Sequence, residues 1–301
     1  MTRRPLVIYH SPCYDGHTAA WVFRKFRGEE ADFVGVNYGK GVEPPDCKGR
    51  IVYCLDFCFD RDTMINKVII PSQSTTVYDH HKTHEAALDG ILEEIRHKKG
   101  LQRSGDKIVF DVSRSGAGIT YDELEREHSK RTGFLTPRHG GRRPLWLVDY
   151  IEDRDIWAWK LPDSKAVAAY TTIVPMTFED WDVLANAKIE DIVERGQAVQ
   201  AYIEAYGNKA CESARMEKIG NYKVPTINIQ YMNCSEHVGK LAELHPTAKF
   251  AAGYYRSLTG SWKFSLRSRG DFDVSEVALK YGGGGHKAAA GFEVESLPWD
   301  K

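Results

Sequence analysis

The chain has 301 residues, of which 42% are hydrophobic and 28% charged, and its formal net charge is -1 at pH 7. This composition excludes a largely disordered protein, and the length predicts two domains. The balanced charge argues against a broad duplex-binding face, which needs many Lys and Arg contacts to phosphates, but it is compatible with a small anionic substrate.

Membrane and secretory segments are not expected. No run is long and apolar enough to span a membrane, and the apolar run after Pro5 ends at His10, too early for a secretory signal. We therefore expect a cytoplasmic protein without a membrane partner. The cysteines show no paired zinc spacing and are predicted to be reduced thiols.

Strand-like and helix-like segments alternate over residues 1–160, which predicts a doubly wound, mainly parallel α/β sheet with helices on both faces. The predicted strands are Leu6–Tyr9, Asp32–Val36, Arg50–Leu55, Thr75–Tyr78 and Lys107–Phe110. The predicted helices are His17–Phe26, Thr83–His97 and Ala117–Glu127. In such sheets ligands bind beyond the carboxyl ends of the strands.

The rest of the chain predicts a helical connection and a smaller α/β domain. Residues 178–216 are rich in Ala and Glu and contain no Pro. Predicted strands follow at Val224–Ile229, Ala248–Tyr254 and Trp262–Leu266, with helices at Ser235–Leu244 and Asp273–Lys280. We expect a catalytic domain over residues 1–177, a connector over 178–217, a substrate-binding domain over 218–301, and a catalytic cleft between the two domains.

The first candidate site is His10-Ser11-Pro12-Cys13-Tyr14-Asp15-Gly16, where a strand ends in His10 and Asp15 stands at a helix start. An imidazole and a carboxylate aimed at one point would suit a divalent ion such as manganese. The alternative is a strand-end histidine with an aspartate that caps the helix.

Asp56 ends the next apolar strand. Its alternative role is a turn or a cap, and Asp60 competes with it for the site. The strand geometry favours Asp56, because Asp60 is expected to cap a helix over Arg61–Val68.

Asp79-His80-His81 is the densest cluster. One imidazole is expected to bind metal, Asp79 to orient it, and the other imidazole to face the substrate. His84, one helical turn later, is interpreted as an ordinary helix residue.

The segment Glu152 to Trp157 is predicted to be a helix end or turn against the core. Asp153 and Asp155 are both candidates for the site, and an ion pair with Arg154 is the alternative.

Gly282 to His286 is the strongest signal in the second half, because consecutive glycines can expose backbone N–H groups to a phosphate. Upstream, Arg267 with Ser268 is a candidate clamp for a terminal phosphate.

In their order and spacing these motifs resemble the DHH phosphoesterase superfamily with its DHH-associated C-terminal domain, over nearly the whole chain. The resemblance implies two divalent ions, manganese with magnesium or zinc as alternatives, bridged by Asp56. One ion would also take His10, and the other would take Asp15, His80 and Asp153. Asp79 would orient His80, and His81 would lie near the scissile phosphate. Substrate would be held by Arg267, Ser268, Gly283, Gly284, Gly285 and His286.

One residue departs from the family pattern. Cys13 stands where the family usually has an aspartate, so either the thiolate binds a softer ion such as zinc or this metal position is weak.

The predicted activity is metal-dependent hydrolysis of phosphodiester bonds in short single-stranded oligonucleotides or nucleotides, as in an oligoribonuclease or exonuclease. The alternatives are a cyclic-dinucleotide or nucleotide bisphosphate phosphatase, a polyphosphate or pyrophosphate hydrolase, and a nucleotide-binding module with a decayed metal site. A homodimer is left open.

Overall fold

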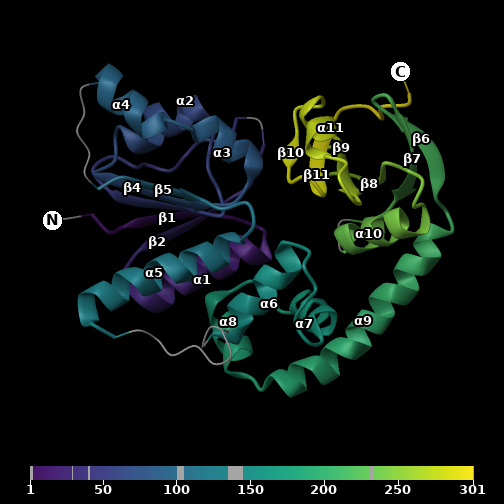
Figure 1. Ribbon diagram of the computed structural model, residues 1–301, viewed down its shortest axis with the longest axis horizontal. Helices are drawn as coiled ribbons and strands as arrows, with labels where there is room; N and C mark the ends of the chain where they lie inside the picture. Colours follow the sequence, from purple (N-terminus) through teal and green to yellow (C-terminus); the bar gives the residue numbers. More distant parts are fainter. Residues whose placement is uncertain are drawn as a thin grey trace. The chain divides into compact units, whose positions relative to one another are not determined.

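The computed structural model describes residues 3–28, 30–39, 41–99, 105–134, 145–230 and 233–300. The chain forms two units, Met1–Gln197 and Ala198–Lys301. The first runs from purple to teal in Figure 1, and the second from green to yellow.

The first unit is built on a parallel sheet of five strands in the order β2-β1-β3-β4-β5. Each predicted strand of this sheet is found within one residue of its predicted ends. The strands are β1 (Leu6–His10), β2 (Asp32–Val36), β3 (Ile51–Leu55), β4 (Ser74–Asp79) and β5 (Lys107–Phe110).

Helices cover both faces of this sheet, as the doubly wound prediction requires (Figure 1). Neighbouring strand residues enter opposite cores, because side chains alternate along a strand: Val7 faces one core and Ile8 the other. The core around Val7 includes residues of α1 (Tyr14–Arg27), α5 (Gly116–Thr132), α6 (Trp146–Asp155), α7 (Ser164–Thr171) and α8 (Phe178–Asn186). The core around Ile8 includes residues of the π-helix η1 (Met64–Ile69), α3 (Lys82–Leu88) and α4 (Ile91–Lys99).

Two local predictions in this unit have different outcomes. The helix predicted over Thr83–His97 is two helices, α3 and α4, because Gly90 between them has a φ of 66°. Asp60 caps the short helix α2 (Arg61–Thr63), as predicted, since its Oδ1 accepts a hydrogen bond of 3.0 Å from the N–H of Thr63.

The strand order places a switch point between β1 and β3. From β1 the chain continues to β2 on one side, whereas β3, β4 and β5 follow on the other. Loops diverge at such a point and leave a crevice beyond the carboxyl ends of the strands. His10 ends β1 and Asp56 directly follows β3, so both residues flank this point.

A long helix, α9 (Ile189–Cys211), contains the boundary between the units. The region predicted to be helical, residues 178–216, contains α8 and α9. The predicted end is too late, because the helix α9 ends at Cys211. Met216 lies in strand β6 (Arg215–Ile219), where antiparallel pairing with β7 (Tyr222–Asn228) overrides helix propensity.

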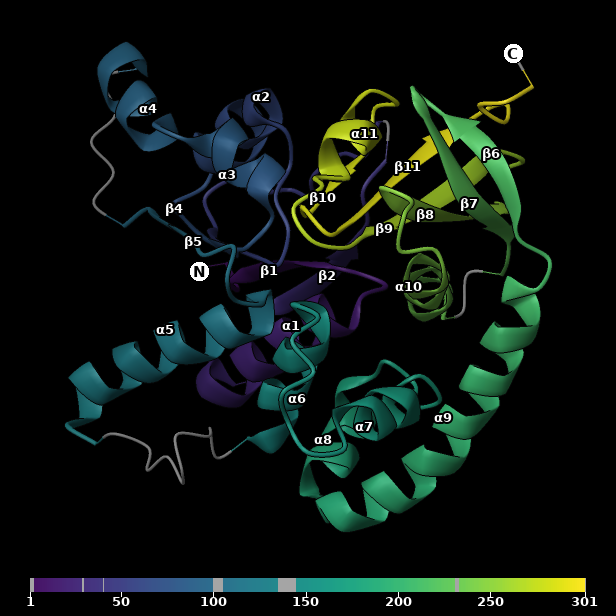
Figure 2. The same cartoon turned by 45° about the vertical axis from the view of Figure 1, so that its right-hand side comes forward.

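The second unit contains a sheet of six strands in the order β10-β11-β9-β8-β7-β6, in which only β7 and β8 pair in parallel. The remaining strands are β8 (Phe250–Arg256), β9 (Trp262–Ser268), β10 (Gly284–Gly285) and β11 (Ala289–Val294). Helix α10 (Cys234–Leu244) contributes to one apolar core and α11 (Ser275–Leu279) to another (Figure 2).

Within the described residues, no helix is both long and apolar enough to cross a membrane. All six cysteines are free thiols, as predicted: Cys13, Cys47, Cys54, Cys58, Cys211 and Cys234.

Candidate metal centre

Three adjacent parallel strands of the first unit are followed by metal-capable side chains at their carboxyl ends. His10 is the last residue of β1, Asp56 follows β3, and His80 follows β4. Asp56 has a φ of 55°, in the left-handed region that Asp and Asn tolerate better than most residues. Its N–H donates a 2.8 Å hydrogen bond to the carbonyl of Tyr78, which fixes this turn against β4.

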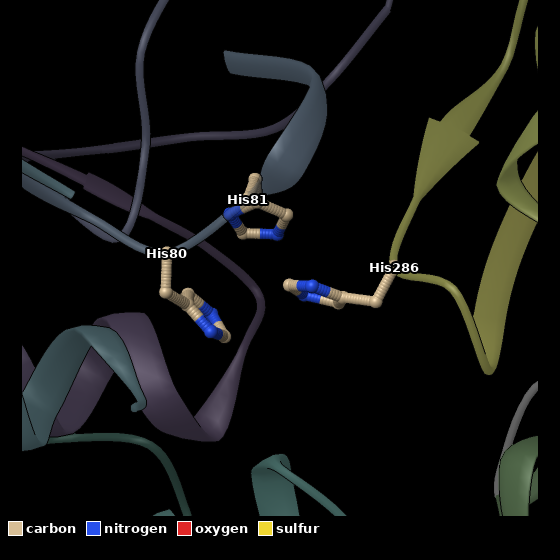
Figure 3. A group of neighbouring side chains, drawn as sticks. All are labelled: His80, His81 and His286. Carbon is tan, nitrogen blue, oxygen red and sulfur yellow. The ribbon is translucent and has the colours of Figure 1, made fainter. Parts of the chain in front are cut away.

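Several groups of three ligand-type side chains form where these strands end. One is His10, Cys13 and Asp56, another is Asp15, His80 and Asp155, and Asp56 also forms a group with Asp79 and His81. Within each group the ligand atoms lie within 4.8 Å of one another. Figure 3 shows the side chain of His80 leaving the chain just after β4.

Asp56 connects the first two of these groups. Its Oδ2 lies 3.4 Å from Nδ1 of His10, and its Oδ1 lies 3.1 Å from Nε2 of His80. The same His80 nitrogen lies 3.6 Å from Oδ2 of Asp15 and 3.5 Å from Oδ2 of Asp155. A single carboxylate thus faces both sets of ligands.

Several of these atoms are buried without a hydrogen bond of acceptable geometry to any described residue. They are both carboxylate oxygens of Asp56, Nδ1 of His10 and Oδ2 of Asp155. Buried polar atoms without partners are costly and rare in folded proteins. Their concentration on facing carboxylate and imidazole groups is the arrangement that a bound cation would satisfy.

The charges point to the same conclusion. Burial, together with the neighbouring Asp56, raises the pKa of Asp15 and also that of Asp155. Burial opposes ionisation of Asp56 too, but the adjacent His10 and His80 imidazoles hold its pKa far below the usual range. Three carboxylates around one imidazole nitrogen repel one another, and a divalent cation would relieve this repulsion.

Asp15 is held in place by the N-terminus of α5. The N–H groups of Gly116 and Ala117 donate hydrogen bonds of 2.6 Å and 2.9 Å to its two carboxylate oxygens. Ser115 caps this helix through a 3.1 Å hydrogen bond from the N–H of Gly118. The first turn of a helix favours an anionic partner, so α5 orients Asp15 and supports its charge.

Asp79 is fully buried and organises the histidines. It accepts hydrogen bonds from the N–H groups of His80, at 2.7 Å, and His81, at 3.2 Å. Its oxygens also lie 2.7 Å from Nδ1 of His81 and 2.7 Å from Nδ1 of His84. Burial alone would raise the pKa of Asp79, but the His81 and His84 imidazoles hold it well below the usual range. Asp79 thus fixes the backbone at His80 and the ring of His81, and Figure 3 draws the side chains of these two histidines.

The two aspartates of α6 have different surroundings. Asp155 belongs to the second ligand group. Asp153, which the family resemblance favoured as a ligand, instead accepts hydrogen bonds from the N–H groups of Lys160, at 2.8 Å, and Leu161, at 3.2 Å. Residues two positions apart on a helix point about 200° apart, so the two carboxylates cannot face one site. Asp153 holds the loop after α6.

Cys13 occupies the N-cap position of α1, where Ser, Thr, Asp and Asn are preferred. Its side chain makes no capping hydrogen bond with the described residues, and its Sγ lies with the ligand atoms of His10 and Asp56. Burial raises the pKa of the Cys13 thiol, and the nearby His10 opposes that rise.

Two residues of this region were missed or misjudged from sequence. His84 is more than an ordinary helix residue, because it contacts Asp79. The i, i+3 spacing from His81 was an available signal, since such residues are neighbours on a helix. Tyr38, in the loop after β2, packs its ring against His10, Phe57 and His81 at centroid distances of 4.6, 4.9 and 5.7 Å. No sequence pattern marked it.

In the second unit, Arg267 and Ser268 make contacts within that unit. The Arg267 guanidinium donates to the hydroxyl of Ser235 and, over 2.8 Å, to the carbonyl of Leu266. The Ser268 hydroxyl donates to the carbonyls of Phe272, at 2.7 Å, and Lys287, at 3.2 Å. Ser268 therefore joins two loops, whereas Arg267 lies beside the start of α10.

The glycine-rich segment forms a tight hairpin. Gly284 and Gly285 of β10 pair with β11, and the N–H of His286 donates a 2.7 Å hydrogen bond to Ala289. A Cβ at Gly283 would lie 2.1 Å from the carbonyl oxygen of Gly291, so the close approach of the two chains requires glycine. The N–H of Gly283 donates a 3.0 Å hydrogen bond to the carbonyl of Ala278. The N–H groups of Gly283 and His286 therefore have partners inside the unit, contrary to the expectation that they are exposed. The His286 side chain, also drawn in Figure 3, leaves the turn of this hairpin.

The donor sets fit divalent ions. Carboxylates with one imidazole, as in the group of Asp15, His80 and Asp155, suit manganese or magnesium. The other group offers an imidazole, a carboxylate and a thiol.

Residues 220–300 of the chain match the DHHA1 domain family. The chain is 24% identical over 326 residues to the uncharacterized protein R106 of Acanthamoeba polyphaga mimivirus, covering 98% of this chain and 70% of that protein.

The solved structures that resemble the chain include two that match most of its length. One is an exopolyphosphatase-related protein from Bacteroides fragilis, with a TM-score of 0.54, 13% identity, and coverage of 98% of this chain and 88% of the other. The second is the pGpG-specific phosphodiesterase PggH from Vibrio cholerae, with a TM-score of 0.47, 12% identity, and coverage of 97% and 93%. The first of these likenesses shows a shared fold.

Proposed function

We propose that the chain belongs to the DHH phosphoesterase superfamily and hydrolyses phosphoric esters in a metal-dependent reaction at the centre around Asp56; the match of residues 220–300 to the DHHA1 family and the shared fold support this. The position of Asp56 carries the proposal. Its buried carboxylate has no hydrogen-bond partner among the described residues and faces two groups of ligand-type side chains. Such a carboxylate is suited to bridge two cations.

We assign one ion to His10, Cys13 and Asp56, and the other to Asp15, His80, Asp155 and Asp56. When bound, such ions lower the pKa of water and neutralise the charge that develops on a phosphoryl group. This assignment replaces Asp153 by Asp155, because the carboxylate of Asp153 is engaged by the loop after α6.

The chain's own residues would bind and orient the substrate. His81 holds its Nδ1 against Asp79, which fixes the ring and directs its Nε2 side away from that carboxylate. We assign His81 to contact the reacting phosphate through Nε2 and Asp79 to position His81. In the second unit, Arg267 and His286 are assigned to bind the substrate's terminal phosphate, since a guanidinium and an imidazole N–H can both donate hydrogen bonds to phosphate.

The proposed substrates are short oligonucleotides or nucleotides, and Tyr38 supports this choice. Residue 38 is 41% exposed as a whole, although its ring packs against His10 and His81. A partly exposed aromatic residue beside ligands of the centre could stack a nucleobase, which polyphosphate lacks.

The proposal is tested by incubating a 5′-labelled RNA trinucleotide with manganese, magnesium or zinc, using the wild type and Asp56→Asn. We expect metal-dependent release of mononucleotides by the wild type and none by the variant. Equal activity of both proteins, after removal of contaminating metal, would refute the assignment.

Parallel reactions with a cyclic dinucleotide, a nucleotide bisphosphate and pyrophosphate test the substrate class. Hydrolysis of one of these in preference to the trinucleotide would replace the proposed substrate while keeping the centre. Nucleotide binding without turnover by any ion would instead indicate a binding module.

A further inference from the structure

The position formed by His10, Cys13 and Asp56 differs chemically from the position formed by Asp15, His80 and Asp155. The second contains two carboxylates and an imidazole, which are hard or borderline donors. The first contains a sulfur atom, and thiolates favour softer ions such as zinc or cobalt over manganese and magnesium. The two positions lie side by side, because His80 approaches Asp56 to 3.1 Å.

The cysteine does not stand alone at this position. Asp56 is 1% exposed, and neither of its carboxylate oxygens has a hydrogen-bond partner among the described residues. Its Oδ2 is directed at Nδ1 of His10, 3.4 Å away, and that nitrogen is also buried without such a partner. The thiol therefore shares its position with two buried polar groups that a cation would satisfy.

The N-cap position of Cys13 gives a second argument that this cysteine is a metal ligand. Cys13 occupies an N-cap position, and a capping Ser, Thr, Asp or Asn there would stabilise α1 by about 1 kcal/mol. An aspartate could supply both a cap and an oxygen ligand. A cysteine gives up that stabilisation, and its Sγ lies within 4.8 Å of the ligand atoms of His10 and Asp56.

We infer that the centre is a mixed-metal site, in which Cys13 binds a thiophilic ion such as zinc as a thiolate while Asp15, His80 and Asp155 take a harder ion such as manganese. On binding, the thiol proton passes to solvent and the sulfur forms one bond to the ion. This inference deepens the proposed function and depends on the same centre.

The test uses the full-length, reduced, metal-free protein titrated with Co²⁺ alone. Thiolate coordination to Co²⁺ produces a sulfur-to-metal charge-transfer band in the near ultraviolet, which oxygen and nitrogen ligands do not give. We expect the band in the wild type and its loss in both Cys13→Ser and Cys13→Asp. Zinc affinity relative to manganese should also fall about tenfold or more in Cys13→Asp.

Cys58→Ser is the matched control. Cys58 is also near ligand-type groups, since its Sγ lies 3.5 Å from Oδ2 of Asp79. The band should persist in Cys58→Ser. The inference would be overturned if the charge-transfer band were absent from the wild type or persisted in Cys13→Ser. It would also be overturned if the band were lost in Cys58→Ser but retained in the Cys13 variants.

Hydrolysis is measured separately to distinguish the two proposals. Manganese-dependent hydrolysis without a charge-transfer band would leave the proposed function intact and refute the thiolate position. A Cys13-dependent band without hydrolysis of any tested ester would support the thiolate position and refute the proposed function. Cys13→Asp and Cys13→Ser serve as independent variants, since either residue can cap α1 and neither supplies a thiolate.

Discussion

The N–H of Gly116 donates a 2.6 Å hydrogen bond to the carboxylate of Asp15, 101 positions earlier in the chain. The same glycine lies against the other side of the centre, because a Cβ at Gly116 would be 2.5 Å from Cβ of Asp56 and 3.0 Å from Oδ2 of Asp15. The absence of a side chain at position 116 therefore allows Asp15 and Asp56 to lie together at the start of α5.

Gly116→Ala should lower the free energy of unfolding by about 1–3 kcal/mol, because the added methyl group overpacks against the backbone-fixed Cβ of Asp56. Metal binding should weaken as well, since Asp15 and Asp56 would be forced apart. Urea unfolding and manganese titration measure the two effects.

Gly118→Ala is the matched control in the same helix turn. Its Cβ would meet the carboxylate end of Glu152, at 2.3 Å, which can rotate away at the cost of its partly exposed ion pair with Arg114. The net change should stay within about 1 kcal/mol, because better helix propensity offsets this loss. An equal effect of both substitutions would contradict the role given to Gly116.

Asp56→Asn should retain the fold and lose the stabilisation that metal provides. Asn tolerates the left-handed conformation of residue 56, whereas the loss of charge removes the bridging ligand. An ion at about a hundred times its Kd stabilises the folded state by about 2.7 kcal/mol. Thermal unfolding with and without manganese should show this increase in the wild type and little of it in the variant. A full increase in Asp56→Asn would remove Asp56 from the centre.

Asp155→Asn and Asp153→Asn should have separable effects. Asp155→Asn should weaken manganese binding by about tenfold or more with little change in metal-free stability. Asp153→Asn should instead cost about 1–3 kcal/mol of stability, because the N–H groups of Lys160 and Leu161 lose their charged acceptor. Isothermal titration and urea unfolding of both variants decide the assignment. The opposite pattern would restore Asp153 as the ligand.

Tyr38→Ala should raise KM for a trinucleotide by about fivefold or more and change kcat less, since stacking contributes about 1–3 kcal/mol per base. Tyr38→Phe keeps the ring and should behave like the wild type. Pyrophosphate has no base, so any hydrolysis of it should not respond to Tyr38→Ala. A similar loss with both substrates would mean that Tyr38 supports the ligands rather than the base.

His17 should make stability depend on pH. It is 4% exposed in α1, where its ring packs against Phe178 and Trp181, and burial lowers its pKa from 6.5. The unfolded chain therefore takes up the proton first as pH falls, so this contribution to stability is present above about pH 6.5 and is lost below it. Urea unfolding of metal-free protein at about pH 7.5 and about pH 5.5 should show a smaller difference in His17→Phe than in the wild type. An unchanged difference would exclude His17 as a source.

The sequence allowed the sheet and much of the centre to be predicted for one physical reason. Apolar strands of a parallel sheet end at one edge, so the polar residues that follow them, such as His10, Asp56 and His80, are brought together by the fold. The periodicity of the chain was sufficient to place those strands.

The remaining features depend on helix phase and on distant packing. The direction of Asp155 follows from where α6 begins and ends, which the run from Glu152 to Trp157 does not specify. Tyr38 reaches the centre from a loop without regular spacing. The hydrogen bond between Gly116 and Asp15 connects two helix starts that are adjacent only in the folded sheet.

The helix α9 determines how the protein can be divided experimentally. The boundary between Gln197 and Ala198 falls inside this helix. A Cβ at Gly196 would lie 2.1 Å from the carbonyl oxygen of Ala166, and one at Gly207 would lie 2.3 Å from Nδ1 of His237, so α9 packs closely within each unit. Cutting the chain at residue 197 would keep each of these contacts but create a new helix end inside α9, next to Gly196, with backbone groups that lose their intrahelical partners in both products. Fragments of the second unit should therefore begin at or before Ile189, and fragments of the first should extend to Cys211.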